Sequence, residues 1–144
     1  MQNLVTPMLT PLEQQLLAAE RGELPIAALI ESLIDAELFM PILEEQKIAN
    51  FHASSQAKPL LLANEEGVET LVLFTSPERA RDFVRDYPGY EGGLLAQLKW
   101  ILARVGSGIA LSLNPEQEVG IDLEANIVEQ LAVRLQQDNN QRVN

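Results

Sequence analysis

Apolar residues recur at helical spacing near both ends of the chain and in short runs between them. Thr10-Pro11-Leu12-Glu13 has the pattern of a capping box with proline in the first turn, which predicts a helix that ends near Gly22. A second helix is predicted after Pro25, where apolar positions repeat at i, i+3, i+4 and i+7. These positions are Ile26, Leu29, Ile30 and Leu33. The two helices are expected to form a hairpin that leads the chain.

The short apolar runs predict strands. Pro41 lacks a ladder donor, so the strand that contains it is expected at a sheet edge or a bulge. The next two runs flank a turn with Asn64 and Gly67, and they are predicted to pair as an antiparallel hairpin. A further strand pair is expected before the last helix. The predicted strands cover residues 38–43, 60–62, 71–74, 109–113 and 119–121.

Three more helices are predicted, at 77–86, 92–105 and 123–137. The middle one is apolar around more than half its circumference, so we expect it between other elements or at a subunit contact. The last is expected to start at an Asp122 N-cap. Its inward residues are predicted to be Ile127, Val128, Leu131 and Leu135. The fold class is therefore α+β, with a mainly antiparallel sheet of about four or five strands covered by helices. We expect one domain over residues 1–144, flexible at 1–9 and 138–144.

Composition limits the function classes. The chain has 144 residues, 47% of them hydrophobic, as expected for one globular domain. It contains no cysteine, so disulfides, thiolate metal sites and a cysteine nucleophile are excluded. The formal charge of −11 opposes binding to nucleic acid and to anionic membranes. No segment approaches the ~20 apolar residues of a membrane span, and no basic leader precedes an apolar run. We expect a cytoplasmic protein without a cofactor.

The candidate catalytic and metal-binding motifs are weak. His52 lies near Ser54 and Ser55, but neighbours in sequence do not provide the convergent geometry of a triad. Residues 106–108 form a Gly-Ser-Gly motif that follows a predicted helix, whereas phosphate loops lead from a strand into a helix. The acid pairs at 44–45 and 65–66 are adjacent residues whose side chains diverge. The sequence therefore predicts neither an enzyme nor a metal site.

The best candidate for a binding site is the corner Thr75-Ser76-Pro77-Glu78-Arg79, where a strand leads into a helix. Free amides at the helix start and a guanidinium can bind an anion or a partner's carboxylate, although Glu78 competes for the same positive helix end. Asn114 is an additional candidate at a nearby turn. Capping by Thr75 or Ser76 with an Arg79–Asp82 pair explains the same residues without a ligand. The candidate residues for ligand or partner binding are Thr75, Ser76, Arg79 and Asn114.

Trp100 is a candidate interface residue on the predicted helix 92–105. Packing in the core or along the helix face is the ordinary role for a tryptophan there. Exposure of Trp100 beside Leu94 and Leu95 would instead indicate a surface for a partner.

Several of these motifs occur in the same order in a known family. The helical hairpin precedes Ala36-Glu-Leu-Phe-Met-Pro41, Lys58-Pro-Leu-Leu-Leu62, Phe74-Thr-Ser-Pro-Glu-Arg79, Trp100 and Leu113-Asn-Pro115. Over about residues 11–135 the chain resembles the amino-terminal domain of the bacterial SseB family. The resemblance implies an α+β cytoplasmic protein with no established catalytic residues to transfer.

Three function classes follow from these observations. We favour a noncatalytic interaction protein, such as an adaptor or regulatory partner, acting on an unidentified protein or as a homodimer. The second class is a regulatory domain that binds a small molecule or peptide at the 75–79 corner. The third is an acidic chaperone or inhibitor of a basic protein, for which binding weakens as salt rises.

Overall fold

The computed structural model describes residues 9–43, 58–106 and 108–142. The predicted helical hairpin is confirmed as α1 (Pro11–Glu20) and α2 (Ile26–Leu33). The capping box is also confirmed: the Thr10 side chain accepts from the Glu13 amide, and the Glu13 side chain accepts from the Thr10 amide. The turn after α1 uses Gly22, whose φ of 78° lies in the left-handed region.

The described strands form two sheets. One is the antiparallel ribbon of β1 (Glu37–Pro41) and β4 (Gly93–Gln97). The other is a four-stranded sheet in the order β2-β3-β5-β6, whose strands span Leu61–Ala63, Glu69–Leu73, Ala110–Leu113 and Ile121–Leu123. The predicted antiparallel hairpin β2–β3 is confirmed. The strand pair predicted before the last helix is present as the antiparallel pair β5–β6, although its second strand begins at Ile121 and not at Val119. Strands β3 and β5 run parallel. The ribbon joins the larger sheet through a bridge between Phe39 and Phe74.

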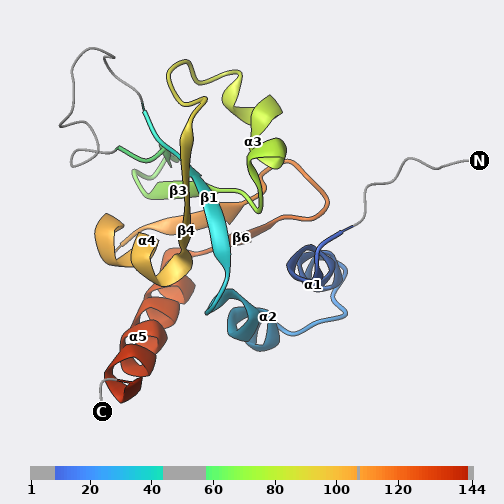
Figure 1. Cartoon of the computed structure of the whole chain (residues 1–144), viewed down its shortest axis with the longest axis vertical. Helices are drawn as coiled ribbons and strands as arrows, with labels where there is room; N and C mark the ends of the chain where they lie inside the picture. Colours follow the sequence, from blue (N-terminus) through green and yellow to red (C-terminus); the bar gives the residue numbers. More distant parts are fainter. Residues whose placement is uncertain (1–8, 44–57, 107, 143–144) are drawn as a thin grey trace, which may run out of the picture.

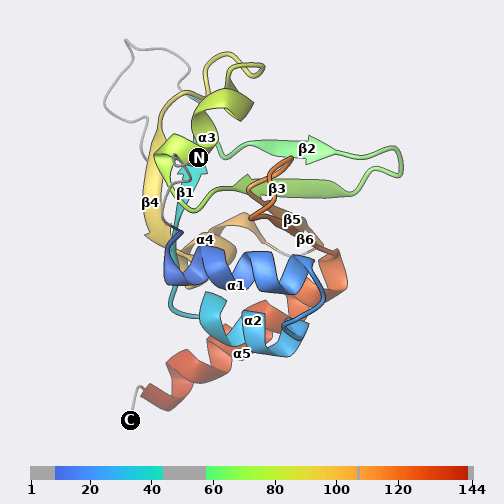
Figure 2. The same cartoon turned by 90° about the vertical axis from the view of Figure 1, so that its right-hand side faces the viewer.

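Alternating side chains place a separate apolar cluster on each face of the larger sheet. Odd-numbered residues, such as Leu71 and Leu113, join the main core with α1, α2 and α5 (Ala125–Arg142). The even-numbered Val72 and Phe74 join a smaller cluster with α3 (Pro77–Val84). Figure 2 shows α1, α2 and α5 below the sheet and α3 above it. The corner between β3 and α3 therefore lies at the end of the sheet where both clusters meet.

The prediction of one helix over 92–105 is wrong. Residues 93–97 form β4, and only Leu98–Val105 form the helix α4. Gly93 explains part of the difference, because a Cβ there would lie 2.3 Å from the carbonyl oxygen of Met40. This close backbone approach favours strand pairing with β1 over the local helical pattern. Figure 1 shows β4 running alongside β1 before the chain turns into α4.

Asp122 is not the N-cap of α5. It lies in β6 and accepts a hydrogen bond of 2.7 Å from the Ser112 hydroxyl across the β5–β6 pair. The helix begins two residues further along, where the Glu124 carbonyl accepts from the amides of Ile127 and Val128. Its predicted inward face is confirmed, since Val128, Leu131 and Leu135 are buried and Ile127 packs against the main core. The helix also continues past its predicted end at residue 137.

Candidate functional site

The corner that follows β3 is built as its sequence predicts. Ser76 is the N-cap of α3, with its hydroxyl accepting from the Arg79 amide at 3.2 Å and Pro77 at the first helical position. Glu78 lies in the same first turn and is exposed. The N-terminus of α3 thus already has a hydroxyl that accepts from one of its amides and a carboxylate close to the positive end of the helix dipole. Both come from this chain, so no ligand is needed there.

Asn114 lies next to Thr75 because β3 and β5 are parallel neighbours that end at the same edge of the sheet. Its Oδ1 accepts from the Thr75 amide at 3.0 Å, and its Nδ2 donates to the Val119 carbonyl at 2.9 Å. Asn114 is fully buried with φ at 52°, a conformation that asparagine tolerates better than most residues. The loop after it packs tightly, since a Cβ on Gly120 would lie 2.3 Å from the Asn114 carbonyl oxygen.

Glu13 is the central residue of the site, and the sequence did not reveal this role. Its Oε2 accepts from the Thr75 hydroxyl at 2.6 Å and from Arg79 Nε at 3.0 Å, while Oε1 accepts from the Thr10 amide. The Glu13 side chain is only 6% exposed. The capping box is the one local signal for this role. It provides a hydrogen-bond partner for one carboxylate oxygen of Glu13 and leaves the other oxygen free to accept from residues distant in sequence.

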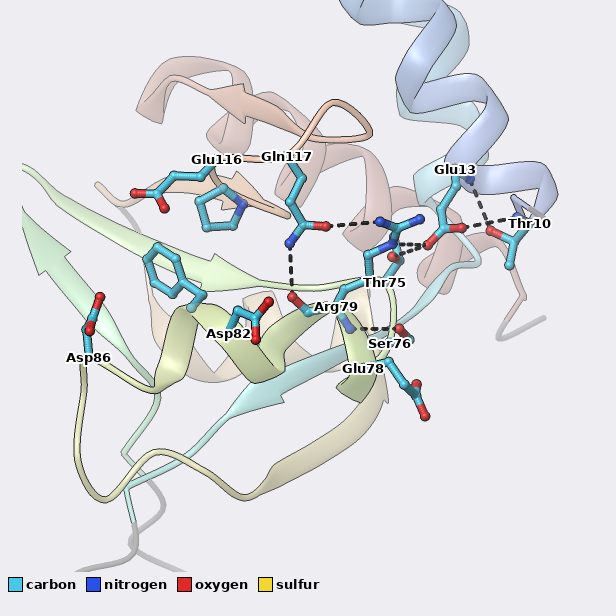
Figure 3. A pocket seen from close by; sticks show the side chains of 12 residues that line it. Thr10, Glu13, Thr75, Ser76, Glu78, Arg79, Asp82, Asp86, Glu116 and Gln117 are labelled. Carbon is cyan, nitrogen blue, oxygen red and sulfur yellow. Dashed lines mark hydrogen bonds and ion pairs between the residues drawn. The ribbon is translucent and has the colours of Figure 1, made fainter. Parts of the chain in front are cut away.

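Gln117 completes the arrangement around Arg79. Its Oε1 accepts from Arg79 Nη1 at 3.2 Å, and its Nε2 donates to the Arg79 carbonyl at 2.9 Å. Figure 3 shows Glu13 and Gln117 approaching the guanidinium from different sides. The predicted Arg79–Asp82 pair is absent from this network: Arg79 pairs with Glu13, and Asp82 pairs with Arg85 on the exposed face of α3. The Arg79 side chain therefore ties α3 to α1 and to the loop after β5.

Two opposing effects act on the Glu13 carboxyl. Burial is the largest single effect and raises its pKa. Hydrogen bonds from the Arg79 side chain, the Thr75 hydroxyl and the Thr10 amide lower it, as does the Arg79 charge. The net result is a pKa below the ordinary value of 4.5. Glu13 is therefore a carboxylate at neutral pH and not a proton-donating group.

A hollow of about 680 Å³ opens beside Arg79, between α1, α3 and the loop after β5. Arg79 is the single basic residue among those that line it, and Glu13 already neutralises this charge. Phe83 and Pro115 add apolar surface to the wall. The exposed acidic residues of the hollow are Glu78, Asp82, Asp86 and Glu116. The hollow therefore carries an excess of negative charge, and Figure 3 shows the Glu78, Asp86 and Glu116 side chains at separate places around it.

The structure brings Thr75, Ser76, Arg79 and Asn114 together, whereas the three candidate interface residues lie on different elements. Leu94 and Leu95 belong to β4 and are 40% and 54% exposed, and Trp100 lies on α4 and is 38% exposed. Trp100 is not in the core: Arg104 Cζ lies 4.2 Å from the centre of its ring. The same helix turns its inner face to the core through Ile101, which has no exposed surface.

Some sequence candidates lie outside the described residues: His52, Ser54, Ser55 and the acid pair 44–45. The other acid pair, Glu65 and Glu66, is exposed in the turn between β2 and β3. In the described part of the chain, no group of three or more His, Cys, Asp or Glu side chains is placed to hold a metal ion. Across 9–43, 58–106 and 108–142, the helices are too short or too polar to cross a membrane.

Comparison with known proteins agrees with the motif order. Residues 12–130 match the family model described as the SseB protein N-terminal domain. No curated protein and no solved structure shows a significant match to the chain. The family match covers most of the sequence, including α1, both sheets, the Thr75–Arg79 corner and the first part of α5. The chain therefore belongs to the SseB family and carries its amino-terminal domain.

Proposed function

We propose that this SseB-family chain is a noncatalytic protein-interaction domain that binds a basic segment of a partner protein over the acidic hollow beside Arg79. The observation that carries this proposal is the charge of the hollow. Exposed carboxylates line its walls, and its one basic side chain is already paired with the buried carboxylate of Glu13. Complementary charge steers and selects a basic partner.

The internal bonding of the corner argues for this function over binding of a small anion. The Thr75 amide is bonded to Asn114, and the Arg79 amide is bonded to Ser76. The guanidinium is held by Glu13 and Gln117. An anion would have to replace these bonds while lying beside the Glu78 carboxylate, which costs desolvation and adds like-charge repulsion.

The acids of the hollow remain accessible to a partner. The Asp82–Arg85 ion pair is 3.0 Å long, but the two side chains are 86% and 70% exposed, so the pair contributes little and is easily exchanged. The overall charge of −11 adds a long-range attraction for basic partners. The role of an acidic chaperone or inhibitor is one form of the same interaction.

Binding of a defined basic peptide, rich in lysine and arginine, tests the proposal. The peptide is titrated into the protein at low and moderate salt while the amide resonances are followed by NMR. We expect shifts at Ser76, Arg79 and Gln117, and weaker binding as the salt concentration rises. An acidic peptide of the same length should leave these resonances unchanged.

A matched pair of triple variants separates the hollow from the general charge of the protein. Glu78→Gln/Asp86→Asn/Glu116→Gln neutralises three acids of the hollow. If each lost charge pair costs about 0.5 kcal/mol, affinity should fall about tenfold. The control, Glu65→Gln/Glu66→Gln/Glu69→Gln, removes three acids of the β2–β3 hairpin. Equal losses in the two variants would contradict a site at the hollow.

A further inference from the structure

Strand β4 lies along one margin of the molecule and has one unpaired edge in the described structure. Its inner edge pairs with β1, and no other described strand pairs with it. Figure 2 shows β4 at the side of the fold, away from the four-stranded sheet. A free sheet edge is a template for another strand, and proteins commonly protect such edges with charged residues or proline. The sequence of β4, Gly-Leu-Leu-Ala-Gln, contains neither.

The ladder shows which backbone groups face outward. The Ile42 amide donates to Gly92, and the Leu98 amide donates to Ala36, so the even-numbered residues of this stretch face β1. Phe39 agrees with this alternation, because its amide and carbonyl bond to Phe74 on the opposite side of β1. The outer edge of β4 consequently presents both backbone groups of Gly93 and Leu95 and the amide of Gln97. The Gln97 carbonyl belongs to the first turn of α4.

We propose that this edge pairs with the same edge of a second copy of the chain, antiparallel and centred on Leu95. In this register Leu95 opposes Leu95, and the two residues exchange a pair of hydrogen bonds. Each Gln97 amide then donates to Gly93 of the second copy. The arrangement aligns β4 over its full length and pairs every outward group of the strand except the Gly93 amide, whose ladder partner would be the Gln97 carbonyl. The same edge serves both copies, which is the self-complementarity that a two-fold interface requires.

Side chains and charge favour a second copy at this edge. Leu94 and Leu95 are among the most exposed large apolar side chains of the described structure. They point to opposite faces of the sheet, and in the dimer each would lie beside an apolar side chain of the second copy. Residues 92–115 contain no acid, although the whole chain carries −11, so the strand that would meet its copy adds no negative charge of its own to the contact. The register also brings exposed Glu91 near the start of α4 in the second copy, where Lys99 lies.

The concentration dependence of mass tests the proposal. Sedimentation equilibrium of the full chain from about 10 µM to about 1 mM covers the range of weak interfaces. We expect a shift from 15.9 kDa to twice that mass. The neutralised triple variant of the hollow should show the same shift, because the dimer does not rest on the proposed function. A single 15.9 kDa species over the whole range would overturn the proposal.

Leu95→Pro removes an outward amide and leaves the ladder to β1 intact. Its circular dichroism spectrum should match that of the wild type, and the variant should remain monomeric. Leu95→Ala is the matched control, since it shortens the same side chain and keeps the amide. It should dimerise more weakly than the wild type but more strongly than the proline variant. Leu95→Lys, which places two like charges opposite each other, is a second disruption that changes no backbone group. A dimer that persists in both the proline and the lysine variants would overturn the proposed edge.

The charge pair tests the register. Lys99→Glu places two acids together and should weaken the dimer several-fold, whereas Glu91→Lys/Lys99→Glu should restore it. A double variant no better than Lys99→Glu would contradict pairing centred on Leu95.

Amide hydrogen exchange identifies the edge directly. The amides of Leu95 and Gln97 should exchange rapidly in dilute protein and slowly in concentrated protein, while those of Leu94 and Ala96 stay protected throughout. Protection of the Leu95 amide in dilute, monomeric protein would mean that another part of the same chain covers the edge, which would overturn pairing with a second copy.

Discussion

The Glu13 carboxylate on α1 accepts a 3.0 Å hydrogen bond from Nε of Arg79 on α3, across 66 positions of sequence. Glu13 also completes the capping box of α1, so one side chain joins a local helix start to a distant one. The pair connects the helical hairpin below the sheet with the helix above it, at the end of the sheet where both apolar clusters meet. The Glu13–Arg79 pair is therefore a structural link between α1 and α3.

A double-mutant cycle measures this link. Glu13→Gln and Arg79→Met each break a pair whose side chains are 6% and 24% exposed. We expect a coupling energy of about 1–2 kcal/mol from urea denaturation, because hydrogen bonds between charged, partly buried groups are stronger than exposed ones. The comparison pair is Asp82 and Arg85, with an expected coupling of about 0.3–0.5 kcal/mol for an exposed pair at helical spacing. Equal couplings would show that burial adds nothing to the Glu13–Arg79 pair.

The same carboxyl gives a pH dependence of stability. Its pKa in the folded protein is lower than the ordinary 4.5. Glu13 is therefore protonated in the unfolded chain at a higher pH than in the folded protein. Its contribution to the free energy of unfolding is complete above pH 4.5 and is lost as the pH falls towards the lower pKa of the folded state. The free energy of unfolding of the wild type should exceed that of Glu13→Gln most at neutral pH, and the difference should shrink in acid. Denaturation curves between about pH 7 and pH 3 measure it, with Glu20→Gln as a variant of equal charge. A difference that is constant with pH would contradict the assigned pairing.

Substitution of Asn114 should destabilise the β5 end of the sheet. Asn114→Ala leaves the partly buried Thr75 amide and the buried Val119 carbonyl without their side-chain partners and keeps a Cβ at φ 52°. We expect a loss of about 2–4 kcal/mol in the free energy of unfolding. Asn114→Gly loses the same hydrogen bonds without the backbone strain, so it should be about 1 kcal/mol more stable than the alanine variant. Thermal denaturation of the two variants side by side checks the order, and the reverse order would contradict backbone strain at this position.

Trp100→Ala should have a small effect on stability. The side chain is 38% exposed and packs against Arg104 on the helix surface, which is worth about 0.5–1 kcal/mol. Ile101→Ala is the comparison on the same helix, and its fully buried side chain should cost about 2–5 kcal/mol. Urea denaturation of the two variants measures both values. A larger loss for Trp100 than for Ile101 would contradict the observed orientation of α4.

Local patterns predicted most elements because their causes are local. A capping box needs only Thr10 and Glu13, and a proline in the first turn needs only its neighbours, so the starts of α1 and α3 follow from sequence. The prediction of one helix over 92–105 is wrong because an apolar run fits a buried helix and a strand equally well. The backbone approach of Gly93 to Met40, which is a long-range contact, decides between them.

The candidate corner shows the same division between local and long-range causes. The sequence by itself determined the family, the α+β class, a cap at Thr75 or Ser76 and the gathering of Thr75, Ser76 and Arg79 on one turn. Tertiary structure alone decided that Glu13 and Gln117 hold Arg79 and that Asn114 holds the Thr75 amide. The reason is physical: a side chain's hydrogen-bonding capacity is a property of its residue type, whereas its partner depends on which strands pair and in which direction. The parallel pairing of β3 with β5 places Asn114 beside Thr75, and no local pattern encodes that pairing.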